Sequence, residues 1–172
     1  QGAASAPRGS MGRVRGRGGV DGACALGHCG GDGTRIASGE RVGIDGAGDF
    51  AWIEAEPSTP ALADRLAAEG VVLGDGQATE ICLALDTWLT DATRHLARGL
   101  VVLVDYAAEP ADLHGAAHST GTLRAFARHA VGSDPFRHVG RQGLTATVDL
   151  EAVRSPAPRA GLAPIGETPP AQ

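Results

Sequence analysis

A carboxylate and a phenol stand side by side at Asp105 and Tyr106, directly after the apolar residues 100–104, LVVLV. An uninterrupted apolar run of this length is typical of a parallel strand covered on both faces, although a buried turn of helix has the same pattern. Ligands of open α/β sheets bind beyond the carboxyl ends of the strands. Asp105 and Tyr106 are therefore candidates for a functional site, and the alternative is that Asp105 only caps a loop.

The segment before this strand has the periodicity of an amphipathic helix. Apolar side chains recur at helical spacing on one predicted face, at Ile81, Leu85, Trp88, Leu89, Ala92 and Leu96. Thr79 can cap the start of the helix, and Gly99 can supply the left-handed residue that ends it. The sequence therefore predicts a helix of about five turns, followed by a strand at the centre of a mostly parallel sheet.

The other elements are predicted from turn residues and apolar spacing. In chain order we expect a hairpin over residues 40–56, a helix over 57–70, a short strand over 71–73, a helix over 120–132 and a strand over 144–148, with Asp149 as a helix cap after it. A loop over residues 107–119 carries His114 and His118, and we expect two lone histidines in such a loop to be solvated. The pattern is that of one α/β domain.

Composition divides the chain into a Gly/Arg-rich start and an acidic remainder. The first 20 residues hold four arginines and no acid, whereas the whole chain carries a net charge of −5. Residues 1–39 show no apolar periodicity, so we expect a disordered tail there, a domain over residues 40–168 and a short tail over 169–172. The acidic domain argues against a nucleic-acid partner, and RNA binding through the arginines of residues 8–19 stays open as an alternative.

Cysteine usage gives no support for a disulfide framework or a metal site. Three cysteines are an odd number, so a reducing, cytoplasmic compartment is the default. Cys24, His28 and Cys29 offer three metal ligands, but a closed zinc site needs four and no second pair follows. No apolar run is long enough to cross a bilayer, and no signal-peptide core is visible. We therefore expect neither a metal nor a membrane partner.

Four motifs in a fixed order carry a family resemblance: ATEI at residues 78–81, LARGLVVLVDY at 96–106, GTLRAFARH at 121–129 and LTATVDL at 144–150. Over residues 40–168 the chain resembles the C-terminal half of the MidA family of S-adenosylmethionine-dependent methyltransferases. Mitochondrial members of that family methylate an arginine of a respiratory complex I subunit. The resemblance implies a partial class I methyltransferase sheet, which is Rossmann-like, with S-adenosylmethionine as cofactor and a protein as substrate.

The resemblance also suggests roles for residues within these motifs. Asp105, Tyr106 and Glu80 are the catalytic candidates, because a carboxylate that pairs with a guanidinium can orient the acceptor nitrogen. The candidate substrate-binding residues are Arg124, His129, Thr145 and Asp149. Beyond such positioning, methyl transfer needs mainly the exclusion of water.

The glycine-rich cofactor loop of the family lies upstream of the matched region. Residues 1–39 contain no strand, GxG loop and helix in succession, so we assign no cofactor-binding residue and expect a fragment that is inactive alone. A non-catalytic remnant or a protein-binding module is the alternative to an enzyme. An uncovered apolar edge at residues 100–104 would favour self-association.

Overall fold

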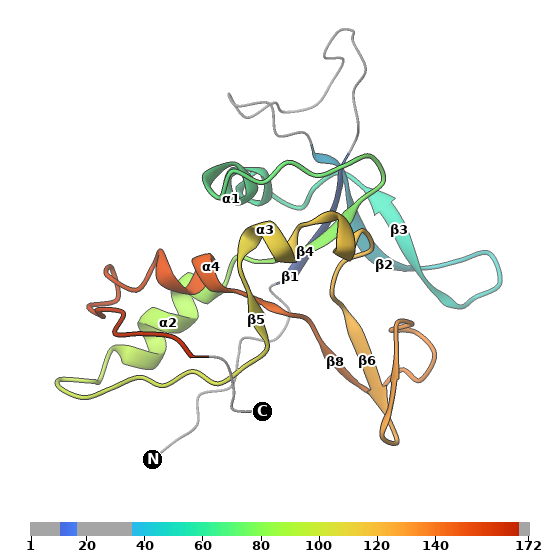
Figure 1. Ribbon diagram of the computed structural model, residues 1–172. Helices are drawn as coiled ribbons and strands as arrows, with labels where there is room; N and C mark the ends of the chain where they lie inside the picture. Colours follow the sequence, from blue (N-terminus) through green and yellow to red (C-terminus); the bar gives the residue numbers. More distant parts are fainter. Residues whose placement is uncertain (1–10, 17–35, 169–172) are drawn as a thin grey trace, which may run out of the picture.

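The centre of the fold is a four-stranded antiparallel sheet. The structure, a computed structural model, describes residues 11–16 and 36–168. The strands follow the order β3–β2–β1–β4 and comprise β1 (Met11–Gly16), β2 (Ile36–Ile44), β3 (Phe50–Ala55) and β4 (Ala78–Cys82). Strand β1 pairs with β2 on one side and β4 on the other, so it occupies an interior position (Figure 1).

Helix α1 (Ala61–Ala68) packs its apolar face into the core beside this sheet. Its Leu62 and Leu66 are 1% and 0% exposed and cluster with Val14 of β1 and Ile81 of β4. Removing one such leucine from water stabilises the fold by about 1.5–3 kcal/mol. Pro60 begins the helix and Gly70, with φ of +66°, follows its end, which confirms the helix expected over residues 57–70.

The hairpin expected over residues 40–56 is also confirmed. Strands β2 and β3 pair in register from Gly39 opposite Ala55 to Ile44 opposite Phe50. The Asp45 carboxylate accepts hydrogen bonds from the N–H groups of Ala47 (2.8 Å) and Asp49 (3.0 Å), which closes the turn.

A second layer consists of short elements from the C-terminal half of the chain. They are α2 (Leu85–Thr93), β5 (Ala107–Ala108), α3 (Pro110–Leu113), the 3₁₀ turn η1 (Ala116–His118), β9 (Val148–Asp149) and α4 (Leu150–Arg154). Strands β5 and β9 form a two-stranded parallel sheet. Helix α4 packs beside α2 (Figure 1), with Leu89 of α2 and Ala152 of α4 both buried.

A third sheet contains β6 (Arg124–Ala127), β7 (Ala130–Gly132) and β8 (Gly143–Thr145). Its strands are antiparallel in the order β7–β6–β8. Figure 1 shows this sheet in orange, extending away from α3 and β4. The loop after β7 returns to the central sheet, where the ring of Phe136 lies 5.1 Å from that of Trp52 and 6.4 Å from that of Phe50.

The prediction of a mostly parallel, Rossmann-like sheet is wrong. Both sheets with more than two strands are antiparallel, and β5 with β9 is the only parallel strand pair among the described residues. Residues 100–104 form no strand, and their side chains are 38–89% exposed. An apolar run becomes a buried strand only beside partner strands, and the described part of the chain places none there.

Two of the expected helices are also corrected. The helix predicted to start at Thr79 is shorter than expected and comprises only Leu85–Thr93. Thr79 itself lies in β4. In the segment 120–132, residues 124–132 form the β6–β7 hairpin, because Arg128 and His129 adopt left-handed φ values of 49° and 66° that close a two-residue turn. Residues 71–73 are not a strand, although Val71 and Leu73 belong to the core.

Within the tail predicted to be disordered over residues 1–39, residues 11–16 form strand β1. Val14 is 0% exposed, and its strand is paired on both sides, so strand pairing outweighs the Gly/Arg-rich composition here. Cys24, His28 and Cys29 lie outside the described residues. Within residues 11–16 and 36–168, no helix is long and apolar enough to span a membrane.

Candidate functional site

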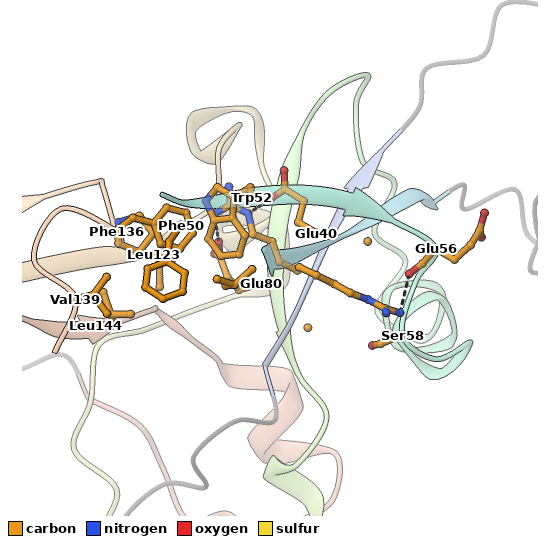
Figure 2. A pocket seen from close by; sticks show the side chains of 16 residues that line it. Glu40, Phe50, Trp52, Glu56, Ser58, Glu80, Leu123, Phe136, Val139 and Leu144 are labelled. Carbon is orange, nitrogen blue, oxygen red and sulfur yellow. Dashed lines mark hydrogen bonds and ion pairs between the residues drawn. The ribbon is translucent and has the colours of Figure 1, made fainter. Parts of the chain in front are cut away.

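A pocket of about 660 Å³ lies between the central sheet and the loop that follows β7. Figure 2 shows its two ends: the aromatic rings gather at one end, and Glu56 and Ser58 mark the other. Its lining residues come from β1, β2, β3, β4 and the segment from β6 to β8, and include Arg13, Glu40, Trp52, Glu80, Phe136 and Leu144. The pocket therefore joins segments from both ends of the sequence.

The guanidinium of Arg13 occupies an acidic and aromatic environment in this pocket. Its Nε lies 2.5 Å from Glu40 Oε2, and its Nη1 lies 3.5 Å from Glu80 Oε1. Its Nη2 donates to the carbonyl oxygen of Thr120 (2.9 Å), and its Cζ lies 4.9 Å from the centre of the Trp52 ring. Both carboxylates are nearly buried, at 3% and 5% exposure, so the ion pairs are shielded from water.

The two oxygens of Glu80 have different surroundings. Oε2 accepts hydrogen bonds from the N–H (2.7 Å) and hydroxyl (3.3 Å) of Thr122, which fix the side chain. Oε1 is buried, faces Arg13 at ion-pair distance and accepts no hydrogen bond. Gly121 passes so close that a Cβ atom there would lie 2.3 Å from Oε1. Glu80 is thus held rigidly while one oxygen keeps its acceptor capacity.

Apolar groups form the rest of the pocket. Leu123, Val139 and Leu144 line it beside the rings of Phe50, Trp52 and Phe136 (Figure 2). An aromatic face beside buried carboxylates suits a guanidinium, which stacks on the ring and pairs with the acids. The pocket therefore combines buried carboxylates, already paired with Arg13, with an aromatic and apolar wall.

Among the residues predicted from sequence, Glu80 lines the pocket and Asp105 and Tyr106 do not. The Asp105 carboxylate accepts a hydrogen bond from the N–H of Tyr106 (2.8 Å), and the Tyr106 side chain is 84% exposed. They lie apart from Glu80 because residues 100–104 do not form the strand that was expected to present them.

Arg124, His129 and Thr145 lie on the third sheet. Arg124 and Thr145 are directly opposite each other on β6 and β8, and both are exposed. Their neighbours Leu123 and Leu144 line the pocket instead, because consecutive residues point to opposite sides along an extended chain. His129 is exposed in the β6–β7 turn.

Asp149 lies in a second, buried group of titratable side chains, with Glu69 and His114. His114 Nε2 lies 3.6 Å from Asp149 Oδ2 and 3.8 Å from Glu69 Oε2, and His114 Nδ1 lies 2.7 Å from the hydroxyl of Thr79. Asp149 also caps α4 by accepting from the N–H groups of Glu151 and Ala152, which confirms the expected cap. His114 is 6% exposed, so the expectation that it is solvated is wrong.

Burial shapes the ionisation of the two acids in this group. Burial, followed by the nearby Asp149 charge, raises the pKa of Glu69 to about 8. Burial also acts to raise the pKa of Asp149, but the His114 ring and the N–H groups of Ala152 and Glu151 outweigh it and hold that pKa below its ordinary value. The site therefore tolerates one negative charge more readily than two.

Sequence reasoning missed Glu40, Trp52, Glu69 and His114. Their partners are distant in the sequence and meet only through the pairing of β1 with β2 and β4 and the packing of helix ends.

The described residues do not fit a class I cofactor cradle. Such a cradle needs a glycine turn between a strand and a helix, where backbone groups approach the ligand. The connections from β3 to α1, β4 to α2 and β5 to α3 contain no glycine, and β9 runs directly into α4. No catalytic step through the cofactor follows from this part of the chain.

Comparisons with solved structures show related folds in Burkholderia thailandensis. One is described as a superfamily member and "likely methyl transferase" bound to S-adenosyl-homocysteine; it has a TM-score of 0.70 and 26% identity, covering 88% of this chain and 34% of that chain. Another, an uncharacterized protein of the same superfamily, has a TM-score of 0.66 and 30% identity, covering 72% of this chain and 33% of that chain. The chain thus spans about a third of the length of these relatives.

Sequence comparison identifies the family of the chain. No curated protein matches the chain. Residues 35–168 match a family described as "Putative S-adenosyl-L-methionine-dependent methyltransferase", whose cofactor is accordingly S-adenosylmethionine. The match includes β2 to α4 and begins after β1. Because it extends over more than half of the sequence, the chain belongs to this family of S-adenosyl-L-methionine-dependent methyltransferases.

Proposed function

We propose that the chain forms the acceptor side of a MidA-type methyltransferase that modifies a protein arginine. The observation that carries the proposal is the environment of Arg13, whose guanidinium lies over Trp52 and beside Glu40 and Glu80. Unlike a compact ammonium group, a planar guanidinium presents several N–H donors in a fixed fork and can reach two carboxylates while its plane stacks on an aromatic ring. A substrate arginine entering the pocket beside Arg13 would meet Glu80 Oε1 and the apolar and aromatic wall.

Glu80 is the residue proposed to orient the acceptor nitrogen. Its Oε1 accepts no hydrogen bond, and its contact with Arg13 is the longer of the two ion pairs. A second guanidinium can therefore donate to Oε1 while Glu40 retains Arg13. The apolar residues around the pocket would exclude water from the bound side chain, and positioning with desolvation is what methyl transfer asks of the protein.

Other parts of the proposal rest on the family resemblance alone. These are the catalytic roles of Asp105 and Tyr106, the substrate-binding roles of Arg124, His129, Thr145 and Asp149, and the choice of a respiratory complex subunit as the protein substrate. S-adenosylmethionine would be bound mainly by groups outside residues 36–168, because their strand-to-helix connections contain no glycine turn.

Peptide titration tests the proposal. Calorimetry of the purified chain with an arginine-containing peptide should give saturable binding that is stronger than for the same peptide with lysine. Glu80→Gln should weaken binding roughly 10–100-fold, the value of a charge-assisted hydrogen bond. Glu109→Gln removes an exposed acid outside the pocket and should change nothing. Equal affinity for the two peptides, or full affinity in Glu80→Gln, would contradict the proposal.

A non-catalytic binding module is the second candidate, and methyl transfer distinguishes the two. We expect the chain alone to bind S-adenosylmethionine negligibly and to transfer no labelled methyl group; saturable micromolar binding would refute that expectation. RNA binding through the first arginines has less support, because Arg13 and Arg15 both pair with Glu40 in the central sheet.

A further inference from the structure

The buried group formed by Glu69, His114 and Asp149 has no part in the proposed function. One ligand-type atom from each side chain lies within 4.8 Å of the others. Each residue flanks a helix: Glu69 follows α1, His114 follows α3, and Asp149 precedes α4. The three side chains therefore converge at a point where three separate helix ends meet.

Several polar atoms of this group lack hydrogen-bond partners. The side chains of Glu69 and His114 are 4% and 2% exposed, and neither the two Glu69 oxygens nor His114 Nε2 takes part in a hydrogen bond. Leaving a buried polar group unsatisfied costs about 1–3 kcal/mol, and native structures contain few such groups. Glu69 Oε1 lies 3.8 Å from Arg65 Nη1, so the unsatisfied atoms that face each other are Glu69 Oε2 and His114 Nε2. Two unsatisfied atoms in one buried cluster indicate a missing binding partner.

Thr79 determines what kind of partner fits. The Thr79 hydroxyl lies 2.7 Å from His114 Nδ1, and in the tautomer whose Nδ1–H donates to this hydroxyl the lone pair of Nε2 faces the two carboxylates. Three acceptor atoms at such short range repel one another unless a proton or a metal cation lies between them. Ligand atoms at about 2.0–2.2 Å from a tetrahedral metal are roughly 3.3–3.6 Å apart, close to the 3.6 Å and 3.8 Å separations here.

We propose that Glu69, His114 and Asp149 bind a divalent transition-metal cation that ties the ends of α1, α3 and α4 together. One imidazole and two carboxylates suit Zn²⁺, Mn²⁺ or Co²⁺. Thr79 acts as a positioning residue, since metal-bound histidines commonly donate their other ring N–H to a neighbouring oxygen.

Titration with Co²⁺ alone, followed by visible absorption and thermal unfolding, tests this site. Cys24, His28 and Cys29 could bind the same ion, so the experiment uses the full chain carrying Cys24→Ser and Cys29→Ser. We expect a saturable spectrum without sulfur-to-cobalt bands and a rise in melting temperature of roughly 5 °C or more at high saturation. His114→Ala should abolish both effects, and His118→Ala, on the same loop, should leave them unchanged.

Two further variants keep the test decisive. Thr79→Val preserves the shape of the side chain and should weaken Co²⁺ binding roughly 10–100-fold, whereas Thr79→Ser retains the hydroxyl and should restore it. If His114→Ala does not fold, Glu69→Gln removes one ligand charge at constant shape and should abolish binding equally. Absence of saturable Co²⁺ binding, or binding that survives in the folded His114→Ala or Glu69→Gln variant, would overturn the proposal.

Discussion

The packed residues around α1 and the exposed residues 100–104 are both leucine- and valine-rich, yet they behave oppositely. Leu62 and Leu66 are at most 1% exposed, whereas Leu100 and Val104 are 73% and 89% exposed. The first pair lies against β1 and β4, and the second has no strand beside it within the described residues. Apolar sequence thus stabilises this chain only where a strand or helix face is present to receive it.

A pair of leucine truncations should give the largest contrast between these regions. Leu66→Ala leaves a cavity in the core and should lower the free energy of unfolding by about 2–5 kcal/mol. Leu100→Ala removes the same atoms from an exposed position and should change it by less than about 0.5 kcal/mol. Urea denaturation measures both, and comparable losses would show that residues 100–104 are buried.

Two glycine substitutions test whether Gly121 packs closely against the Glu80 carboxylate. Gly121→Ala combines a φ of +81° with a Cβ position 2.3 Å from Glu80, and should cost about 1–3 kcal/mol. Gly140→Ala has a similar φ of +77° but open space around its Cβ, so it reports the backbone strain alone. If the two variants lose the same stability, Gly121 does not pack closely against Glu80.

We propose that residues 100–104 mediate self-association, and charge insertion tests this. Val102→Asp should shift the chain toward monomer in sedimentation experiments, with little change in stability, because Val102 is 77% exposed. Val72→Asp places the same charge at a valine that is 69% exposed elsewhere on the surface and should not alter association. A wild-type chain that is monomeric at high concentration would contradict the proposal.

The smallest effect is expected at the exposed pairing of Arg154 with Glu109 and Glu167. Hydrogen bonds from Arg154 hold the pKa of both acids below 4.5, so this stabilisation is present above pH 4.5 and is lost as the pH falls through the lowered values. Arg154→Gln should therefore reduce the urea midpoint slightly at pH 7 and not at low pH. A larger loss at low pH would contradict this sign.

Local signals predicted part of this fold correctly. The β2–β3 hairpin was predicted from its Gly-rich turn, α1 from Pro60 and Gly70, and the helix cap from Asp149. The backbone preferences of such residues act within a few positions. The helix expected over residues 120–132 failed because β6 and β8 pair across the chain, and a short apolar pattern does not distinguish helix from strand. Residues 100–104 failed because burial depends on neighbours that lie elsewhere in the chain.

Of the residues that line the candidate site, only Glu80 was predicted as a site residue from the sequence. Its family motif singled it out, whereas Arg13, Glu40 and Trp52 join it through strand pairings that no local pattern encodes. The Gly/Arg-rich composition around Arg13 suggested disorder, yet β1 completes the central sheet. Site residues that meet through long-range pairing were therefore beyond sequence reasoning.

The most direct test of the central claim, that an arginine side chain binds in this pocket, uses the two tryptophans of the chain. Trp52 lines the pocket and Trp88 lies on α2, outside it, so their indole N–H resonances give a reporter and an internal control. During titration with an arginine-containing peptide, the Trp52 resonance should shift saturably while the Trp88 resonance stays fixed, and Glu80→Gln should suppress the shift. A peptide that binds without moving the Trp52 resonance, or that moves only the Trp88 resonance, would contradict the account.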